Sequence, residues 1–289
     1  MVKTKNYTSL ISTAQYTFHM PKISVEVPVT WGTYLSKILE ALRAQTFQDY
    51  EVCVASSLKE DQHKDLLESF GAKFVSSGPN ILEKRYRAHQ LCRGEYSLLL
   101  DETRVPHRTL LERLDLHDED MVIISEGEAR DSFWEKAAHL DKLLIHKCPD
   151  LDFTKGYILP RYFRSTLLTL AFENVKKKIG DKKFVQVLME DHQLISYEAS
   201  LLSNRVAIIN DILIMHYGDR TLSEILSKYH RYGRHHRVLK GTPYEFMLNL
   251  LKRRRRTCKD FRLTWTQHAQ LMILYLARGI PFAIGYYIW

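Results

Sequence analysis

The chain has 289 residues, of which 45% are hydrophobic, and a formal net charge of +8. That hydrophobic content excludes a generally disordered protein, and the length is sufficient to bury the core of one large domain or of a domain with an appendage. The four cysteines have no C-x-x-C spacing, which argues against a disulfide framework or a zinc site and for a reducing cytosol.

Strand-like and helix-like segments alternate through the first hundred residues. Apolar patterning predicts strands at 23–29, 50–55 and 73–75, and helices at 34–44, 61–70 and 82–91. This alternation is typical of an α/β fold with a doubly wound, mostly parallel sheet flanked by helices. Residues 1–21 have weak periodicity and no signal-peptide pattern, so we expect an irregular N-terminal extension.

A short apolar run at residues 97–100 ends in two acids, Asp101 and Glu102. The run is too short for a helix and predicts a buried strand whose carboxyl end opens into the crevice where α/β sheets bind ligands. A carboxylate pair there suits a divalent metal that holds a phosphorylated substrate, because hard cations prefer oxygen ligands. Taken alone, the segment fits equally well a strand end whose acids are only solvated.

The C-terminal quarter of the chain supplies its basic charge. Residues 217–289 contain 14 Lys and Arg against 4 Asp and Glu, with the densest run at 252–256. Next to that run, residues 271–289 are apolar and aromatic-rich, and Arg278 is their one charged residue. A basic run beside an apolar segment predicts peripheral attachment to an anionic membrane surface.

Three alternatives for this region stay open. The apolar segment could pack onto the rest of the chain or onto a partner. A full membrane span is disfavoured because Arg278, Gly279 and Pro281 interrupt the apolar run near its middle. Nucleic acid is not an expected partner, since no nucleic-acid-binding motif accompanies the basic residues.

Several motifs follow one another in a set order along the chain. The first is the predicted strand with Pro28, followed by the predicted helix and then by Gln45-Thr46-Phe47-Gln48-Asp49-Tyr50-Glu51-Val52. The second is Gly94-Glu95-Tyr96, which precedes the apolar run and Asp101. The others are Glu190-Asp191-His192-Gln193-Leu194, and His216-Tyr217-Gly218 followed by Lys228-Tyr229-His230-Arg231-Tyr232-Gly233. Over roughly residues 22–241 this order resembles the family-2 glycosyltransferases of the GT-A fold, in a membrane-associated, microbial or archaeal-type branch.

The resemblance implies an inverting glycosyltransferase. Such an enzyme would move a sugar from a UDP- or GDP-sugar donor to a lipid-linked or surface-glycan acceptor. We expect it to be cytoplasmic and peripheral on the inner face of the cell membrane. Residues 22–216 would form the GT-A catalytic domain, and residues 217–289 would serve membrane association and the acceptor side.

The resemblance also implies roles for single residues. Asp191 would be the general base, with Glu190 beside it as a second catalytic residue. Mg²⁺ or Mn²⁺ would be held by Asp101, Thr103 and His216. The donor would be bound by Pro28, Ser56, Lys84, Arg85, Arg87, Asp101, Glu102 and His216. Arg161 or Arg164 would contact an acceptor phosphate.

From the residues alone, other readings of these positions stay open. Glu190 and Asp191 also fit the N-terminus of a helix, where acids are common. Lys84 and Arg87 also fit a solvated helix face, and His216 fits a structural histidine. A further histidine- and arginine-rich stretch at 230–237 is too dense in polar residues for a core, and we expect it at the surface.

Two positions depart from the pattern of the family. Ser56 and Ser57 stand where the family has an acid that reads the nucleotide base, and Thr103 stands where it has the second acid of D-x-D. A non-catalytic GT-A-like membrane-binding or scaffold protein is therefore the rival hypothesis. A nucleotidyltransferase would need a glycine-rich basic loop after the first strand, and residues 30–33 are too short and uncharged for that.

Overall fold

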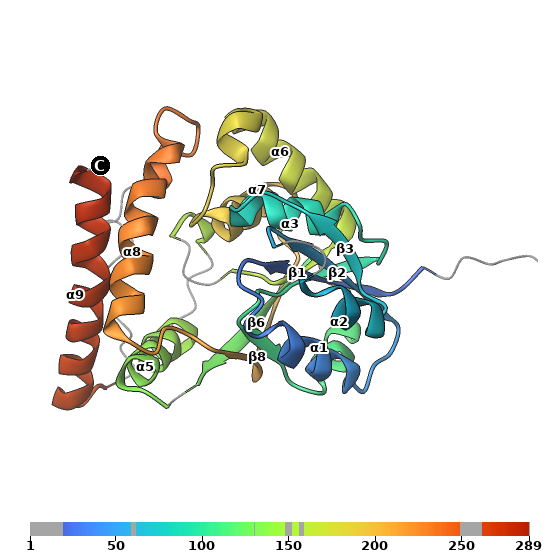
Figure 1. Cartoon of the computed structure of the whole chain (residues 1–289), viewed down its shortest axis with the longest axis horizontal. Helices are drawn as coiled ribbons and strands as arrows, with labels where there is room; N and C mark the ends of the chain where they lie inside the picture. The colour runs from blue at the N-terminus through green and yellow to red at the C-terminus, as the bar shows by residue number, and fades with distance from the viewer. Residues whose placement is uncertain are drawn as a thin grey trace, which may run out of the picture.

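The computed structural model describes residues 20–58, 62–129, 131–147, 152–155, 159–248 and 262–288 (Figure 1). Almost all of the predicted N-terminal extension and the basic run at 252–256 lie outside the described residues. Eight strands form one sheet in the order β3-β2-β1-β4-β7-β6-β8-β5. They are β1 (Ile23–Val29), β2 (Tyr50–Ser56), β3 (Lys73–Ser76), β4 (Tyr96–Leu99), β5 (Arg104–Pro106), β6 (Met121–Glu128), β7 (Tyr162–Arg164) and β8 (Val206–His216).

The first half of the sheet is parallel. β1 pairs in parallel with β2 and β4, and β2 pairs in parallel with β3. The connecting helices are α1 (Leu35–Arg43), α2 (Lys64–Ser69) and α3 (Ile81–His89). All the strands and helices predicted for this half are confirmed. β1 is buried at every position, and the buried residues of α1 lie on one side of the helix, as expected for a parallel sheet covered by helices.

Two apolar cores cover the two faces of the sheet. Neighbouring strand residues point to opposite faces, so Leu98 joins the core that includes α1 and α4 (Leu110–Asp115), whereas Leu99 joins the core that includes α6 (Ser165–Phe184) and α7 (Asp191–Leu202). Figure 1 shows α3, α6 and α7 on one side of the sheet and α1 and α2 on the other.

The second half of the sheet is mixed. β7 lies between β4 and β6 and is antiparallel to both, whereas β6 and β8 are parallel and β5 is antiparallel at the edge. The predicted α/β fold class is confirmed, with β7 and β5 as its antiparallel strands. Since β1, β4, β6 and β8 run in the same direction, their carboxyl ends share one edge of the sheet, which is where open α/β sheets bind ligands.

Three helices and three short turns of the described residues follow or flank this sheet. They are α5 (Phe133–Lys147), α8 (Leu222–His236), α9 (Trp265–Ile288), and short 3₁₀ turns at Phe153–Lys155, Arg237–Leu239 and Glu245–Leu248. α8 and α9 lie side by side and also face α5 (Figure 1). A Cβ atom on Gly233 of α8 would lie 2.1 Å from the carbonyl oxygen of Phe282, and one on Gly285 of α9 would lie 2.2 Å from that of His230. The two helix backbones therefore touch at these glycines.

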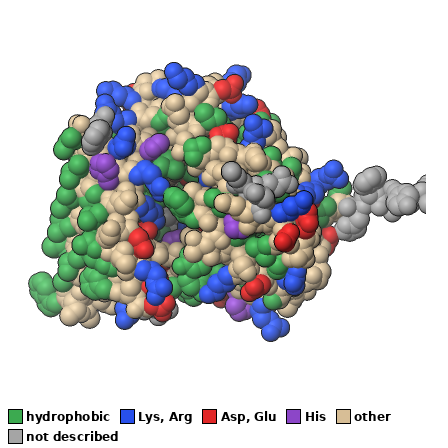
Figure 2. Space-filling view, viewed as in Figure 1, with side chains coloured by type: hydrophobic (Ala, Val, Ile, Leu, Met, Phe, Trp, Pro, Cys, Tyr) green, Lys and Arg blue, Asp and Glu red, His purple; other side chains and the backbone are tan. Residues whose placement is uncertain are grey.

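The outer side of α9 is an apolar stripe. Met272, Leu276, Ile280, Ile284 and Ile288 recur every fourth residue and are all exposed. Figure 2 shows hydrophobic side chains gathered along the edge of the molecule where α9 lies. By length and composition alone α9 is long and apolar enough to cross a membrane, with 33% of its most apolar window buried in the molecule. The helix continues through Pro281 without a break.

Candidate active site

One guanidinium joins the two carboxylates that the sequence singles out. Asp101 follows β4 and Asp191 begins α7, and both reach Arg85 of α3, which is 2% exposed. Arg85 Nε donates to Asp191 Oδ2 at 2.5 Å, and its Nη2 group pairs with Asp101 Oδ1. The structure thus brings three predicted site residues together at the carboxyl edge of the sheet.

Asp101 is surrounded by positive charge. Besides Arg85, its carboxylate pairs with Arg104 and lies 3.6 Å from Arg161 Nη1. Burial alone would raise the pKa of Asp101, but the charges of Arg104, Arg85 and Arg161 outweigh it and hold this pKa well below its usual range. Asp101 is therefore ionised at any physiological pH.

Asp191 is in a different electrostatic situation. Its burial raises the pKa, the charge of Arg85 opposes this rise, and the charge of Asp101 adds to it. The net result is a pKa raised above the ordinary value. A carboxylate with a raised pKa accepts a proton more readily, which suits a general base.

A second group of charges lies on β6, and the sequence did not reveal it. Glu126 accepts hydrogen bonds from Arg104 Nε at 3.0 Å and from Lys142 Nζ at 2.7 Å, and it also pairs with Arg161. Glu128, two residues further, faces the same side of the strand. Charged residues at every second position near the end of an apolar strand were the signal that could have identified this pair.

His216 ends β8 beside Glu128. Its Nδ1 lies 2.6 Å from Glu128 Oε1, and Lys142 Nζ reaches the same oxygen at 2.7 Å. Burial and the nearby charges of Lys142 and Arg104 lower the pKa of His216 to about 4, so its imidazole is neutral at pH 7. The pKa of Glu128 falls to about 2, because its hydrogen bond to His216 and the charge of Lys142 outweigh the effect of burial.

The donor-side residues predicted on α3 separate into buried and exposed groups. Lys84 is fully buried and donates to Thr30 Oγ1 at 2.7 Å, whereas Arg87 is exposed. Lys84 and Arg87 therefore differ in burial although they are three residues apart on α3, and Arg85 is the buried neighbour of Lys84. Burial lowers the pKa of Lys84 to about 8. A solvated position is excluded for Lys84 but fits Arg87.

The remaining predicted residues bond to the backbone, lie inside a strand, or form ion pairs with other side chains. One oxygen of Glu102 accepts hydrogen bonds from the backbone N–H groups of Thr30, Trp31 and Gly32 at 2.9–3.0 Å, so it fixes the loop after β1. Pro28 lies inside β1, and Ser56 accepts a hydrogen bond from the backbone of Leu58. Arg164, which ends β7, pairs with Asp120 and Glu95, and Arg161 belongs to the Asp101 cluster.

Glu190 is paired away from the cluster around Arg85. Its carboxylate bonds to Nδ1 of His236, and both side chains are at most 1% exposed. The His236 ring lies 5.2 Å from Phe282 and 5.8 Å from Tyr286 of α9, measured between ring centroids. The prediction that the stretch 230–237 lies at the surface is therefore wrong for His236, because α9 covers it.

The predicted metal ligands do not fit a divalent ion as they are arranged. Both oxygens of Asp101 face guanidinium groups, and Nδ1 of His216 is bonded to Glu128. Thr103 accepts a hydrogen bond from the Tyr217 N–H through its carbonyl. An ion at Asp101 would have to displace an arginine, so we derive no step through a metal.

A different group in the described part of the chain has metal-ligand spacing. Ligand atoms of Glu26, His89 and Cys92 all lie within 4.8 Å of one another. The two nitrogens of His89 already contact Glu26 Oε1 and Thr169 Oγ1, each at 2.8 Å. This cluster lies between β1 and α3 and contains none of the predicted ligands.

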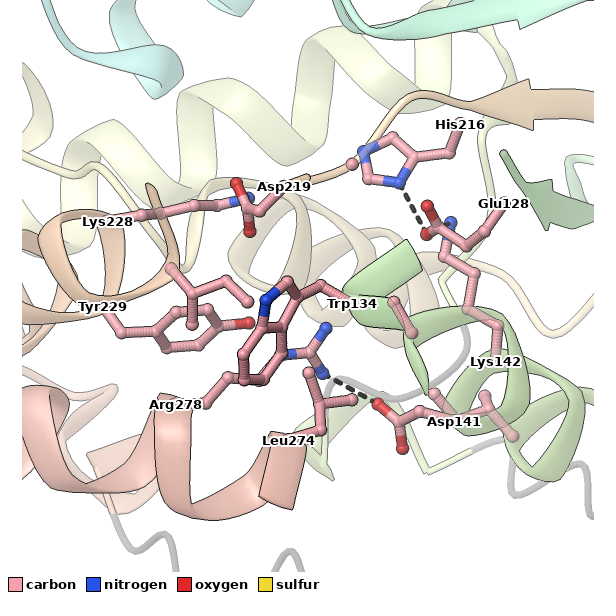
Figure 3. A pocket seen from close by; sticks show the side chains of 14 residues that line it. Glu128, Trp134, Asp141, Lys142, His216, Asp219, Lys228, Tyr229, Leu274 and Arg278 are labelled. Carbon is pink, nitrogen blue, oxygen red and sulfur yellow. Dashed lines mark hydrogen bonds and ion pairs between the residues drawn. The ribbon is translucent and has the colours of Figure 1, made fainter. Parts of the chain in front are cut away.

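A cavity lies beside His216 (Figure 3). It has a volume of about 180 Å³ and is bounded by α5, α8, α9 and the ends of β6 and β8. Glu128 and His216 line it on the side of the sheet, and Lys228, Tyr229 and Arg278 line it from the C-terminal helices. It is therefore enclosed jointly by the predicted catalytic domain and the C-terminal region.

The sheet order, its two helical layers and the charged edge define a GT-A glycosyltransferase fold, and comparison with solved structures supports this. The structure of S. aureus TarS 1–349 is 16% identical with a TM-score of 0.51, and the match covers 92% of this chain and 81% of that one. TarS 1–349 in complex with UDP-GlcNAc is 15% identical with a TM-score of 0.51, covering 92% and 89%.

A more distant similarity is to glucosyl-3-phosphoglycerate synthase from Mycobacterium tuberculosis. Its structure in complex with Mn²⁺, UDP and glucosyl-3-phosphoglycerate is 17% identical with a TM-score of 0.42, covering 71% of this chain and 75% of that one. No protein-family model matches the sequence, and a search of curated proteins finds no significant match. At these identities the two TarS comparisons establish the fold alone, and the chain has the GT-A fold.

Proposed function

We propose that the protein is an inverting glycosyltransferase that uses a UDP- or GDP-sugar and a hydroxyl acceptor on a lipid-linked or surface glycan. The observation that carries the proposal is the Asp191–Arg85–Asp101 arrangement at the carboxyl edge of a GT-A sheet. The TarS structure with bound UDP-GlcNAc supports a nucleotide-sugar donor, because this chain shares its fold.

The chemistry requires one base and several cations. In the proposed reaction Asp191 takes the proton of the acceptor hydroxyl, the acceptor oxygen forms a bond to the anomeric carbon, and the bond from that carbon to the diphosphate breaks. The raised pKa of Asp191 favours the proton transfer. The leaving diphosphate gains negative charge, which Lys84 and the arginines near Asp101 would stabilise.

Arg85 has a second task in this proposal. Because it contacts both carboxylates, it holds Asp191 in one orientation and offsets the repulsion between the two negative charges. Mg²⁺ or Mn²⁺ at Asp101 stays a prediction. A titration of donor binding with Mn²⁺ in EDTA-treated protein measures whether the ion contributes.

The test of the function uses the full chain and a panel of UDP- and GDP-sugars. A donor that binds the folded state raises the melting temperature. With that donor, Asp191→Asn is expected to lower turnover by about 10²- to 10⁴-fold, the contribution of a general base, and to leave the donor-induced melting shift intact. Asp211→Asn is the matched control, because Asp211 is exposed and pairs with Arg113 at the surface.

Two results would contradict the proposal. If no nucleotide sugar raises the melting temperature, the non-catalytic rival gains support. If the donor binds and Asp191→Asn turns over as fast as the control, Asp191 is not the base.

The membrane location is a separate part of the proposal. We infer that α9 lies on an anionic membrane at the cytoplasmic face, and that the basic run at 252–256 adds electrostatic attraction. The exposed stripe of Met272, Leu276, Ile280, Ile284 and Ile288 supports this, because it is an apolar face that extends from residue 272 to the end of the helix. The opposite side of α9 packs on α8 and α5, which favours a helix lying at the interface over a helix that spans the membrane.

A further inference from the structure

The cavity beside His216 has a balanced charge. Three acids and three bases line it: Glu128, Asp141 and Asp219, and Lys142, Lys228 and Arg278. They form ion pairs at 2.7–3.1 Å: Lys142 with Glu128, Lys228 with Asp219, and Arg278 with Asp141. A site for a phosphate would present unpaired cations, so this lining suits a neutral ligand.

Two buried polar atoms in the lining lack a partner among the described residues. Glu128 is 2% exposed, and its Oε2 accepts no hydrogen bond, while Nε of Arg278 donates none. Buried polar atoms are nearly always paired, with protein, water or a ligand. One atom is an acceptor and the other is a donor, so a ligand with hydroxyl groups satisfies both, since a hydroxyl donates and accepts.

Gly218 lies next to the unpaired oxygen of Glu128. A Cβ atom at this position would lie 2.9 Å from Glu128 Oε2 and 3.6 Å from the His216 ring. A side chain there would therefore occupy the space next to the unpaired oxygen. Because Gly218 also lines the cavity, the unpaired oxygen lies directly behind the cavity wall, at a position where the chain has no side chain.

Aromatic rings complete the cavity. Trp134 of α5 and Tyr229 of α8 both line it (Figure 3), and the guanidinium carbon of Arg278 lies 5.5 Å from the centre of the Tyr229 ring. Ligand sites typically combine aromatic and apolar walls with a few placed polar groups. The volume of about 180 Å³ exceeds by far the space that a single water needs, which is about 10–15 Å³.

Tyr232 of α8 links the cavity lining electrostatically to the proposed base. Tyr232, one turn after Tyr229 on α8, is influenced by the charge of Asp191 and by those of Lys228 and Asp219 of the cavity lining. Lys228 Nζ lies 5.9 Å from the centre of the Tyr232 ring. Tyr232 is therefore close to one cation of the cavity lining and within the electrostatic influence of the proposed base.

We propose that this cavity binds one neutral sugar ring of the acceptor, with ring hydroxyls on Glu128 Oε2 and Arg278 Nε and the ring face on Trp134 or Tyr229. The proposal rests on the proposed glycosyltransferase function and adds the acceptor class to it. The C-terminal helices α8 and α9 then supply part of the acceptor site. The side of α9 that lines the cavity is opposite its exposed apolar stripe.

The test measures sugar binding directly, without turnover. Glucose, mannose and N-acetylglucosamine at millimolar concentration, and inorganic phosphate as the anionic probe, are added to the full chain and followed by ligand-observed NMR. At least one sugar is expected to bind, and phosphate is expected not to compete with it. Gly218→Ala and Trp134→Leu should each weaken sugar binding by about fivefold or more, the scale of one lost hydrogen bond or ring contact.

Controls separate this proposal from the function itself. Trp265→Leu is the matched control for Trp134→Leu, because Trp265 is 90% exposed on α9 and lines no part of the cavity. The melting shift with the nucleotide sugar is measured on every variant. If it persists while no sugar binds, or while both cavity variants bind sugar like the control, the acceptor-site proposal is overturned and the proposed function stands.

Two other outcomes also decide the matter. If phosphate displaces the sugar, the cavity is an anion site and the inference is wrong. If sugar binds normally and no nucleotide sugar does, the proposed glycosyltransferase function fails while the carbohydrate site remains. If a cavity variant has a lowered melting temperature, Glu128→Gln replaces it, because glutamine keeps the shape of the side chain and is a weaker hydrogen-bond acceptor.

Discussion

Replacing Arg85 by methionine tests the electrostatic arrangement of the candidate active site. Methionine keeps much of the length and none of the charge, so Asp191 loses the guanidinium 2.5 Å away and still faces the charge of Asp101. Arg85 is the cation that lowers the pKa of Asp191, whereas Asp101 keeps Arg104 and Arg161. The change should therefore affect the two carboxylates unequally.

The magnitude follows from the geometry. An opposite charge at this distance lowers a carboxyl pKa by about 1–3 units, so its removal should raise that of Asp191 by about as much. Each unit corresponds to about 1.4 kcal/mol and to a tenfold change in the ionised fraction below the pKa. In the proposed reaction the ionised form is the base, so the acid limb of the pH–rate profile should shift to higher pH by that amount.

The assay is the pH dependence of kcat/KM from pH 4 to 9 with the donor identified by melting shift. Arg85→Lys keeps a charge and should shift the limb less, and Arg87→Met is the matched control, since Arg87 is exposed on the same helix. An acid limb for Arg85→Met that coincides with that of Arg87→Met would refute the reasoning. Circular dichroism across the same pH range checks that the variant stays folded.

Three other predictions follow from features outside that contact. In the wild type, donor binding should weaken as the pH rises through about 8, because Lys84 loses its charge there. Lys84→Met should bind the donor equally at pH 7 and pH 9, which calorimetry at the two pH values measures. His236→Leu leaves the Glu190 carboxylate buried without its partner and should lower the free energy of unfolding by about 3–5 kcal/mol, and adding Glu190→Gln should restore part of it in urea denaturation. Leu276→Gln should weaken cosedimentation with anionic vesicles. Leu201→Gln, the matched control, should not, although Leu201 is 58% exposed and Leu276 is 54% exposed; equal effects would exclude α9 as the membrane face.

The parallel half of the fold was predictable from the sequence because its signals are local. The alternation in β1 and the apolar spacing of α1 can each be recognised within one short segment of the sequence. The antiparallel β7, which lies between β4 and β6 in the sheet, was not predicted. Its three residues are too few to show a periodic pattern. Its place depends on strands that are distant in the sequence.

The candidate site was predictable in part. Asp101 and Asp191 stand in short motifs, so their positions could be named, but the partner that joins them was one of three neighbouring bases on α3. Glu126 and the burial of His236 escaped, because each depends on a contact with a distant element. Sequence patterns identify the groups that carry charge, and the fold decides which of them neutralise one another.

The crossing of α8 and α9 has a consequence for how this protein can change over evolutionary time. Gly233 and Gly285 each meet a carbonyl of the opposite helix, so a larger residue at either one separates the helices. Separation would also withdraw Phe282 from His236, which holds the residue next to Asp191. These positions should therefore vary together among relatives: lineages that keep one glycine should keep the other, and lineages that lose both should also have replaced His236.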